Sequence, residues 1–101
     1  MYRKIIEEFS KFPRDIHTVP LKSNKSLWFH VFVKDNTIYI EPSHNKTPSS
    51  KVQTRKLPES ECAKILEIYH RRAKGKAVSK EAQACTYSQV YWYGIFAEMN
   101  L

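Results

Sequence analysis

The chain has 101 residues, of which 42% are hydrophobic and 13% aromatic, so it can bury a modest core and does not have the composition of a disordered protein. Its formal net charge is +7 and its pI about 9.5, values that are typical of proteins that bind polyanions. No apolar run is long enough to span a membrane, and the N-terminus lacks the apolar core of a signal peptide. We therefore expect a cytoplasmic protein, folded as a single domain over residues 1–101.

The first part of the chain predicts a helix followed by a weak strand. Residues 2–12 form an amphipathic pattern whose apolar stripe consists of Tyr2, Ile5, Ile6 and Phe9. Pro13 ends this helix, because the residue before a proline avoids the α conformation. Residues 17–22 predict a short strand, and Pro20 would restrict it to the edge of a sheet because proline cannot donate to a strand ladder.

A β-hairpin is predicted over residues 27–41. Residues 27–34 alternate between two faces, and Lys34-Asp35-Asn36 supplies the turn before the returning strand at residues 37–41. One face carries aliphatic residues and Phe29. The other face carries aromatic residues as well, namely Trp28, Phe32 and Tyr39. We expect a helix to cover this second face; left uncovered, it would be a surface on which bases can stack.

The middle of the chain predicts a loop and a third strand. Residues 42–50 are rich in proline and serine and contain no apolar residue, as is typical of a loop. Residues 51–56 alternate weakly. We expect the inward side chains to be Val52 and Thr54 and the outward side chains to be Lys51, Gln53 and Arg55.

The C-terminal part predicts two or three helices. Residues 58–74 form a strong helical pattern that Gly75 is placed to end, and residues 80–85 form a shorter helix. Thr86 and Gln89 have the spacing of a capping box for a last helix over residues 87–99. The helix pair also resembles a helix-turn-helix motif, but we expect a helical hairpin packed on the sheet. The predicted fold is therefore α+β: an N-terminal helix, a small antiparallel sheet built on the hairpin, and two to three C-terminal helices.

The positive charge is concentrated in one stretch of the sequence. Residues 43–80 contain ten basic and three acidic side chains, a net charge of +7, whereas residues 81–101 carry a net charge of −2. Clustered lysines and arginines on a loop and a helix end suit a nucleic-acid backbone. We expect phosphate contacts from Lys46, Lys51, Arg55, Lys56, Arg71, Arg72, Lys74 and Lys76.

These observations predict a non-catalytic nucleic-acid-binding protein, with DNA favoured slightly over RNA. We expect no metal and no cofactor, since no metal-ligand spacing or glycine-rich phosphate loop is found. Three alternatives stay open. A metal-independent ribonuclease would use His30, His44 and His70 with Arg55 and Arg71. A homodimer or protein-interaction module would use the apolar residues 87–99, and an acidic protein partner would satisfy much of the same charge.

Overall fold

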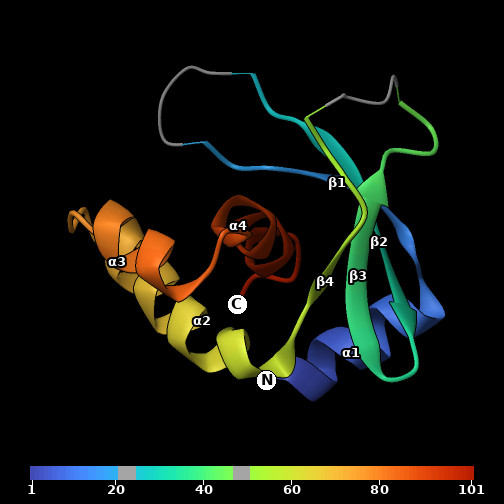
Figure 1. Ribbon diagram of the computed structural model, residues 1–101, viewed down its shortest axis with the longest axis horizontal. Helices are drawn as coiled ribbons and strands as arrows, with labels where there is room; N and C mark the ends of the chain where they lie inside the picture. The colour runs from blue at the N-terminus through green and yellow to red at the C-terminus, as the bar shows by residue number, and fades with distance from the viewer. Residues whose placement is uncertain (21–24, 47–50) are drawn as a thin grey trace.

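The computed structural model describes residues 1–20, 25–46 and 51–101. The elements in chain order are α1 (Tyr2–Lys11), β1 (Arg14–His17), β2 (Trp28–Lys34), β3 (Thr37–Pro42), β4 (Arg55–Leu57), α2 (Glu59–Ala73), α3 (Ser79–Cys85) and α4 (Gln89–Glu98). The predicted α+β fold is confirmed, with one N-terminal helix, a four-stranded sheet and three C-terminal helices. Figure 1 shows α2, α3 and α4 to the left of the sheet and α1 at its lower end.

The sheet is an antiparallel meander in the order β1-β2-β3-β4. Its centre is the predicted hairpin, in which β2 and β3 are joined by a two-residue turn. Asp35 and Asn36 in this turn have φ angles of 52° and 57°. Two positive φ angles in succession are typical of the turn whose twist matches that of the flanking strands, and Asp and Asn tolerate this conformation better than most residues.

All the helices that pack on the sheet lie on its inner face. Arg14 of β1 is paired with Val31 and shares this face. Its guanidinium contacts Glu8 of α1 and Glu98 of α4, each at 3.0 Å, so both helices lie on the same side. The fully buried side chains between the helices and the sheet include Ile5, Phe9, Phe29, Val31, Ile38, Ile40, Trp92 and Phe96. This core occupies most of the inner face of the sheet, with Arg14 and Arg55 at intermediate burial on the same face.

Two strand predictions need correction. The predicted strand at residues 17–22 is instead β1, which begins at Arg14 and ends at His17; residues 21–24 lie outside the described part of the chain. The predicted strand at residues 51–56 is β4, which covers only residues 55–57. Arg55 points inward, because its pairing with Ile40 places it on the helix side of the sheet. Val52 is buried, as predicted, but Thr54 is exposed, so the predicted alternation does not continue into β4, whose buried side chain is Leu57.

The end of α2 follows the prediction. Gly75 has φ +85°, its N–H donates to the carbonyl of Arg72, and the Lys76 N–H donates to the carbonyl of Arg71. These two bonds form the Schellman motif, which satisfies the free carbonyls of the last turn. None of the helices in the described part of the chain has the length and apolarity that crossing a bilayer requires.

The start of α4 differs from the prediction. Thr86 accepts a hydrogen bond from the Ser88 N–H at 2.9 Å, and the buried Oε1 of Gln89 has no hydrogen-bond partner. The capping box is therefore not formed, and the helix begins at Gln89 rather than at residue 87. The residues from Tyr91 to Phe96 are all buried, because α4 packs against both β1 and α2. Burial within the domain thus accounts for the apolar character of this helix.

Candidate nucleic-acid interface

The second face of the sheet carries aromatic and polar side chains that no helix of the described chain covers. We call it the outer face and define it, from the strand register, as Asp15, His17, Trp28, His30, Phe32, Lys34, Thr37, Tyr39, Glu41 and Lys56. The expectation that a helix covers its aromatic residues is wrong. The helices are needed on the inner face, where the fully buried side chains lie, and Figure 1 shows α2, α3 and α4 on one side of the sheet.

One cross-strand row of the outer face contains Phe32, Tyr39 and Lys56. The register pairs Phe32 with Tyr39 and Tyr39 with Lys56. The two rings have centroids 5.5 Å apart and planes inclined by only 15°. Both aromatic side chains are half-buried and Lys56 is exposed. This row therefore places two stacked, partly exposed rings beside a positive charge.

A second row lies at the other end of β2. Trp28 is paired with His17, and the two rings meet edge to face with centroids 5.1 Å apart. The ammonium group of Lys46 lies 4.9 Å from the centroid of the Trp28 ring, within the range of a cation–π contact. Lys46 is exposed, so its charge remains available to solvent at this edge of the outer face.

Between these rows lies a hydrogen-bonded cluster around Asp15. The carboxylate of Asp15 accepts hydrogen bonds from the Ser43 hydroxyl at 2.6 Å, from the Asn45 N–H at 2.8 Å and from the His44 N–H at 3.1 Å. His30 Nδ1 lies 2.9 Å from the same carboxylate. Burial raises the pKa of this carboxyl, but the four hydrogen bonds outweigh burial and hold it well below its usual range. Asp15 is therefore ionised and fixes the chain that follows β3.

The cluster continues to Glu41 and His44. His44 stacks on His30 with ring centroids 3.5 Å apart and planes inclined by 6°. Its Nε2 contacts a carboxylate oxygen of Glu41, which is paired with His30 across β2 and β3. Two imidazoles and two carboxylates thus occupy the centre of the outer face.

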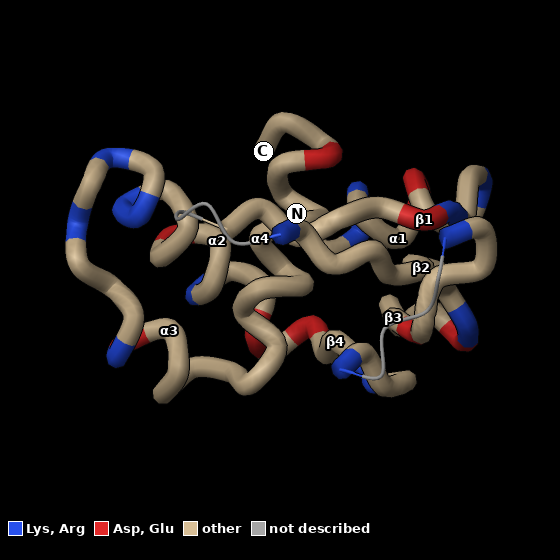
Figure 2. Tube along the Cα trace, turned by 90° about the horizontal axis from the view of Figure 1, so that it is seen from above, with Lys and Arg blue, Asp and Glu red and all other residues tan. Residues whose placement is uncertain are grey.

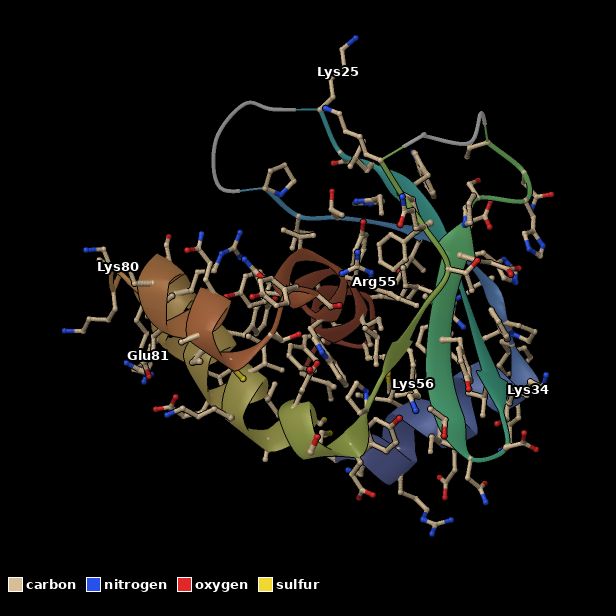
Figure 3. All side chains as sticks on the ribbon, in the orientation of Figure 1. Lys25, Lys34, Arg55, Lys56, Lys80 and Glu81 are labelled. Carbon is tan, nitrogen blue, oxygen red and sulfur yellow. The ribbon has the colours of Figure 1, made fainter. Side chains whose placement is uncertain are left out.

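The predicted phosphate contacts are divided among different parts of the molecule. Lys56 lies on the outer face and Lys46 at its edge, while Lys51 is exposed in the segment before β4. Arg55 faces the helices: its guanidinium donates to the Ser88 hydroxyl at 3.2 Å and lies 5.6 Å from the centroid of the Tyr91 ring. Figure 3 shows Arg55 directed toward α4.

The remaining predicted contacts lie around the C-terminal end of α2. Arg71 forms ion pairs with Glu67 and Glu81, and its hydrogen bonds to these carboxylates raise its pKa above the usual value. Arg72 donates to the backbone carbonyl of Val19 at 2.7 Å. Lys74 and Lys76 are exposed beside them. Figure 2 shows this basic segment at the end of the molecule opposite the sheet, so the eight predicted residues do not converge on one face.

The residues considered for a ribonuclease are also separated. His30 and His44 are in contact, but His70 is exposed on α2, where its ring lies against Tyr69. Arg55 faces α4 and Arg71 is held in its ion pairs. The structure therefore brings together two of these five side chains.

Sequence reasoning missed the roles of Asp15, Glu41 and Ser43 in the cluster. The sequence does contain a signal for Glu41 and Ser43, because they lie where the hairpin ends and the following loop begins. Loops next to a rigid scaffold commonly carry functional side chains. Asp15 gave no such signal, because it is far from this segment in the sequence. No family model, curated protein or solved structure matches this chain.

Proposed function

We propose that the outer face of the sheet binds single-stranded nucleic acid without catalysis, by stacking bases on its aromatic rings and pairing the backbone with its lysines. One observation carries the proposal: Phe32, Tyr39 and Lys56 form a continuous row on a face that no described helix covers. The core lies on the other side of the sheet and does not include these two rings. Packing of the core therefore does not explain why aromatic residues occupy this face.

Stacking supports a single-stranded partner rather than a duplex. The bases of a duplex are already stacked on one another, whereas those of a single strand can lie against protein rings, at roughly 1–3 kcal/mol per base. The near-parallel rings of Phe32 and Tyr39 allow successive bases to continue one stack. Trp28 provides a further ring toward the other end of β2.

Charge supports a polyanionic partner on the same face. Lys34 at the end of β2, Lys46 beside Trp28, and Lys56 on β4 are all exposed. The acidic groups of this face are engaged: the Asp15 side chain is only 6% exposed, and Glu41 contacts His44. Lysines at its periphery can therefore reach phosphates while the acidic groups are held by their own partners. That DNA is preferred to RNA stays a prediction, because stacking and phosphate pairing are open to both.

The test is fluorescence anisotropy with labelled DNA and RNA oligonucleotides, single-stranded and duplex, at low salt. We expect the single strands to bind more tightly. Phe32→Ala and Tyr39→Ala should each weaken binding by roughly 10- to 100-fold, the equivalent of one lost base stack. Each variant is first shown by circular dichroism to be folded.

Tyr87→Ala is the matched control. Tyr87 is 91% exposed and lies between α3 and α4, away from the outer face. Removing its ring should leave affinity unchanged. The proposal is wrong if the wild type does not retain either oligonucleotide, or if Tyr87→Ala weakens binding as much as the two outer-face substitutions.

A further inference from the structure

The centre of the outer face gathers side chains that commonly bind metals. One nitrogen from His30, one from His44 and one carboxylate oxygen of Glu41 all lie within 4.8 Å of one another. Within the described part of the chain, this is the one group of three such side chains that comes together in this way. The residues belong to β2, to β3 and to the turn after β3, so the sheet register fixes two of the three.

We propose that His30, Glu41 and His44 form a binding site for a divalent transition-metal ion of the zinc type. Two imidazoles with one carboxylate are a donor set that suits zinc and its neighbours, whereas magnesium and calcium prefer oxygen ligands alone. Three protein ligands leave one position of a tetrahedral ion for water or for an anionic ligand.

Asp15 prepares His30 for this role. The Asp15 carboxylate lies 2.9 Å from His30 Nδ1, an arrangement in which Nδ1 donates the hydrogen bond and the oxygen accepts it. The lone pair of a neutral His30 is then on Nε2, which is the atom free to coordinate a metal. A histidine oriented by a carboxylate in this manner is the usual outer-shell arrangement of metal sites. The side chains of His30 and Asp15 are only 11% and 6% exposed, which holds this pair in place.

The other two ligands can adjust to an ion. Zinc bonds of about 2.0–2.1 Å place the donor atoms of a tetrahedral site about 3.3 Å apart, closer than the 4.8 Å limit observed for this cluster. The side chains of His44 and Glu41 are 50% and 29% exposed, so both can rotate toward an ion held by the fixed His30. The contact between His44 and Glu41 would be replaced by bonds from both side chains to the ion.

The stacking of the histidines argues against acid–base catalysis by this pair. Cleavage of a phosphodiester by two histidines needs the acid and the base on opposite sides of the phosphate. The rings of His30 and His44 are in van der Waals contact at 3.5 Å, so no phosphate fits between them. A single metal ion needs both rings on one side of it, and the exposed His44 ring would tilt out of the stack to bind, because an imidazole nitrogen coordinates within its own ring plane.

The experiment uses the metal alone, with no nucleic acid. Zn²⁺ is titrated into the full chain by calorimetry, and Co²⁺ is added in parallel because a four-coordinate cobalt site absorbs strongly in the visible. We expect one ion per chain, visible cobalt bands, and no binding of Mg²⁺ under the same conditions. His44→Ala and Glu41→Gln, both at partly exposed side chains, should each weaken Zn²⁺ binding by roughly 10- to 100-fold.

His70→Ala is the control, since His70 is an exposed histidine on α2, outside the cluster. It should leave both the affinity and the cobalt spectrum unchanged. The site is refuted by unchanged affinity in both cluster variants, by an equal loss in His70→Ala, or by the absence of cobalt bands. Because the probe is the ion, these outcomes are independent of whether the outer face binds a nucleic acid.

Discussion

Gly94 of α4 packs directly against the backbone carbonyl oxygen of His17 in β1: a Cβ atom on Gly94 would lie 2.8 Å from that oxygen and 3.1 Å from the ring of Phe29. The carbonyl belongs to the backbone of the sheet and cannot move aside independently. The absence of a side chain at Gly94 therefore sets how closely α4 approaches β1, and through α4 how Trp92 and Phe96 enter the core.

Substitution of Gly94 by alanine tests this contact. Helix propensity alone predicts that Gly94→Ala stabilises the protein by about 1 kcal/mol. We expect the reverse, a loss of about 1–3 kcal/mol, because the added methyl group overpacks the interface between helix and sheet. Urea denaturation monitored by circular dichroism measures the difference. Ala63→Gly, at an exposed position of α2, measures the difference in helix propensity between alanine and glycine without a packing effect. A Gly94→Ala variant more stable than wild type would contradict the close approach of α4 to β1.

Asp15 should make stability depend on pH under acidic conditions. Its pKa is lower in the folded protein than the value of about 3.9 in an unfolded chain. The stabilisation is therefore complete above about pH 5 and is lost as the pH falls below 4 toward the folded-state pKa. Asp15→Asn should lower the free energy of unfolding by roughly 2–3 kcal/mol at pH 7.

The pH dependence separates this effect from a general loss of packing. The difference between wild type and Asp15→Asn, measured by urea denaturation, should shrink as the pH is lowered from 5 to 2. Asp35→Asn is the control: Asp35 is exposed in the hairpin turn, and its substitution should change stability by less than about 0.5 kcal/mol. A constant difference between wild type and Asp15→Asn across this pH range would show that the carboxylate charge is not the stabilising feature.

Arg55 and Lys56 are adjacent in β4 and point to opposite faces of the sheet, so they should behave oppositely. Arg55→Ala should lower stability by about 1–2 kcal/mol, since it removes the hydrogen bond to Ser88, and should leave nucleic-acid affinity unchanged. Lys56→Ala should leave stability unchanged, weaken binding, and reduce the slope of log affinity against log salt by about 1. Anisotropy at several salt concentrations and urea denaturation measure both properties. If Arg55→Ala weakens binding and Lys56→Ala does not, the outer face is not the binding surface.

The elements that the sequence predicts well are those whose pattern is local. The hairpin needs only alternation and a turn, and α2 needs only its apolar stripe and Gly75. The short strands β1 and β4 have 4 and 3 residues, too few for alternation to fix their bounds or phase. Their positions depend on pairing with β2 and β3, which is a tertiary effect.

The candidate site was harder to predict than the fold, for the same reason. The aromatic residues of the second face follow from alternation, but which face receives the helices is decided by the packing of the whole chain. Asp15 is separated by 28 residues from Ser43 and by 29 from His44. No spacing rule links such distant positions, so the cluster exists only once β1 pairs with β2.

The alternation of β2 also limits how this protein can change. Phe29, Val31 and Val33 share one face, and their intervening neighbours share the other. Deleting or inserting one residue within the strand would exchange the two sets and bring Trp28 and His30 toward the helices. Replacing an outer side chain, in contrast, leaves the core in place. The length of this strand is therefore under tighter constraint than the identity of its outer residues, so the chemistry of the outer face can change by point substitution alone.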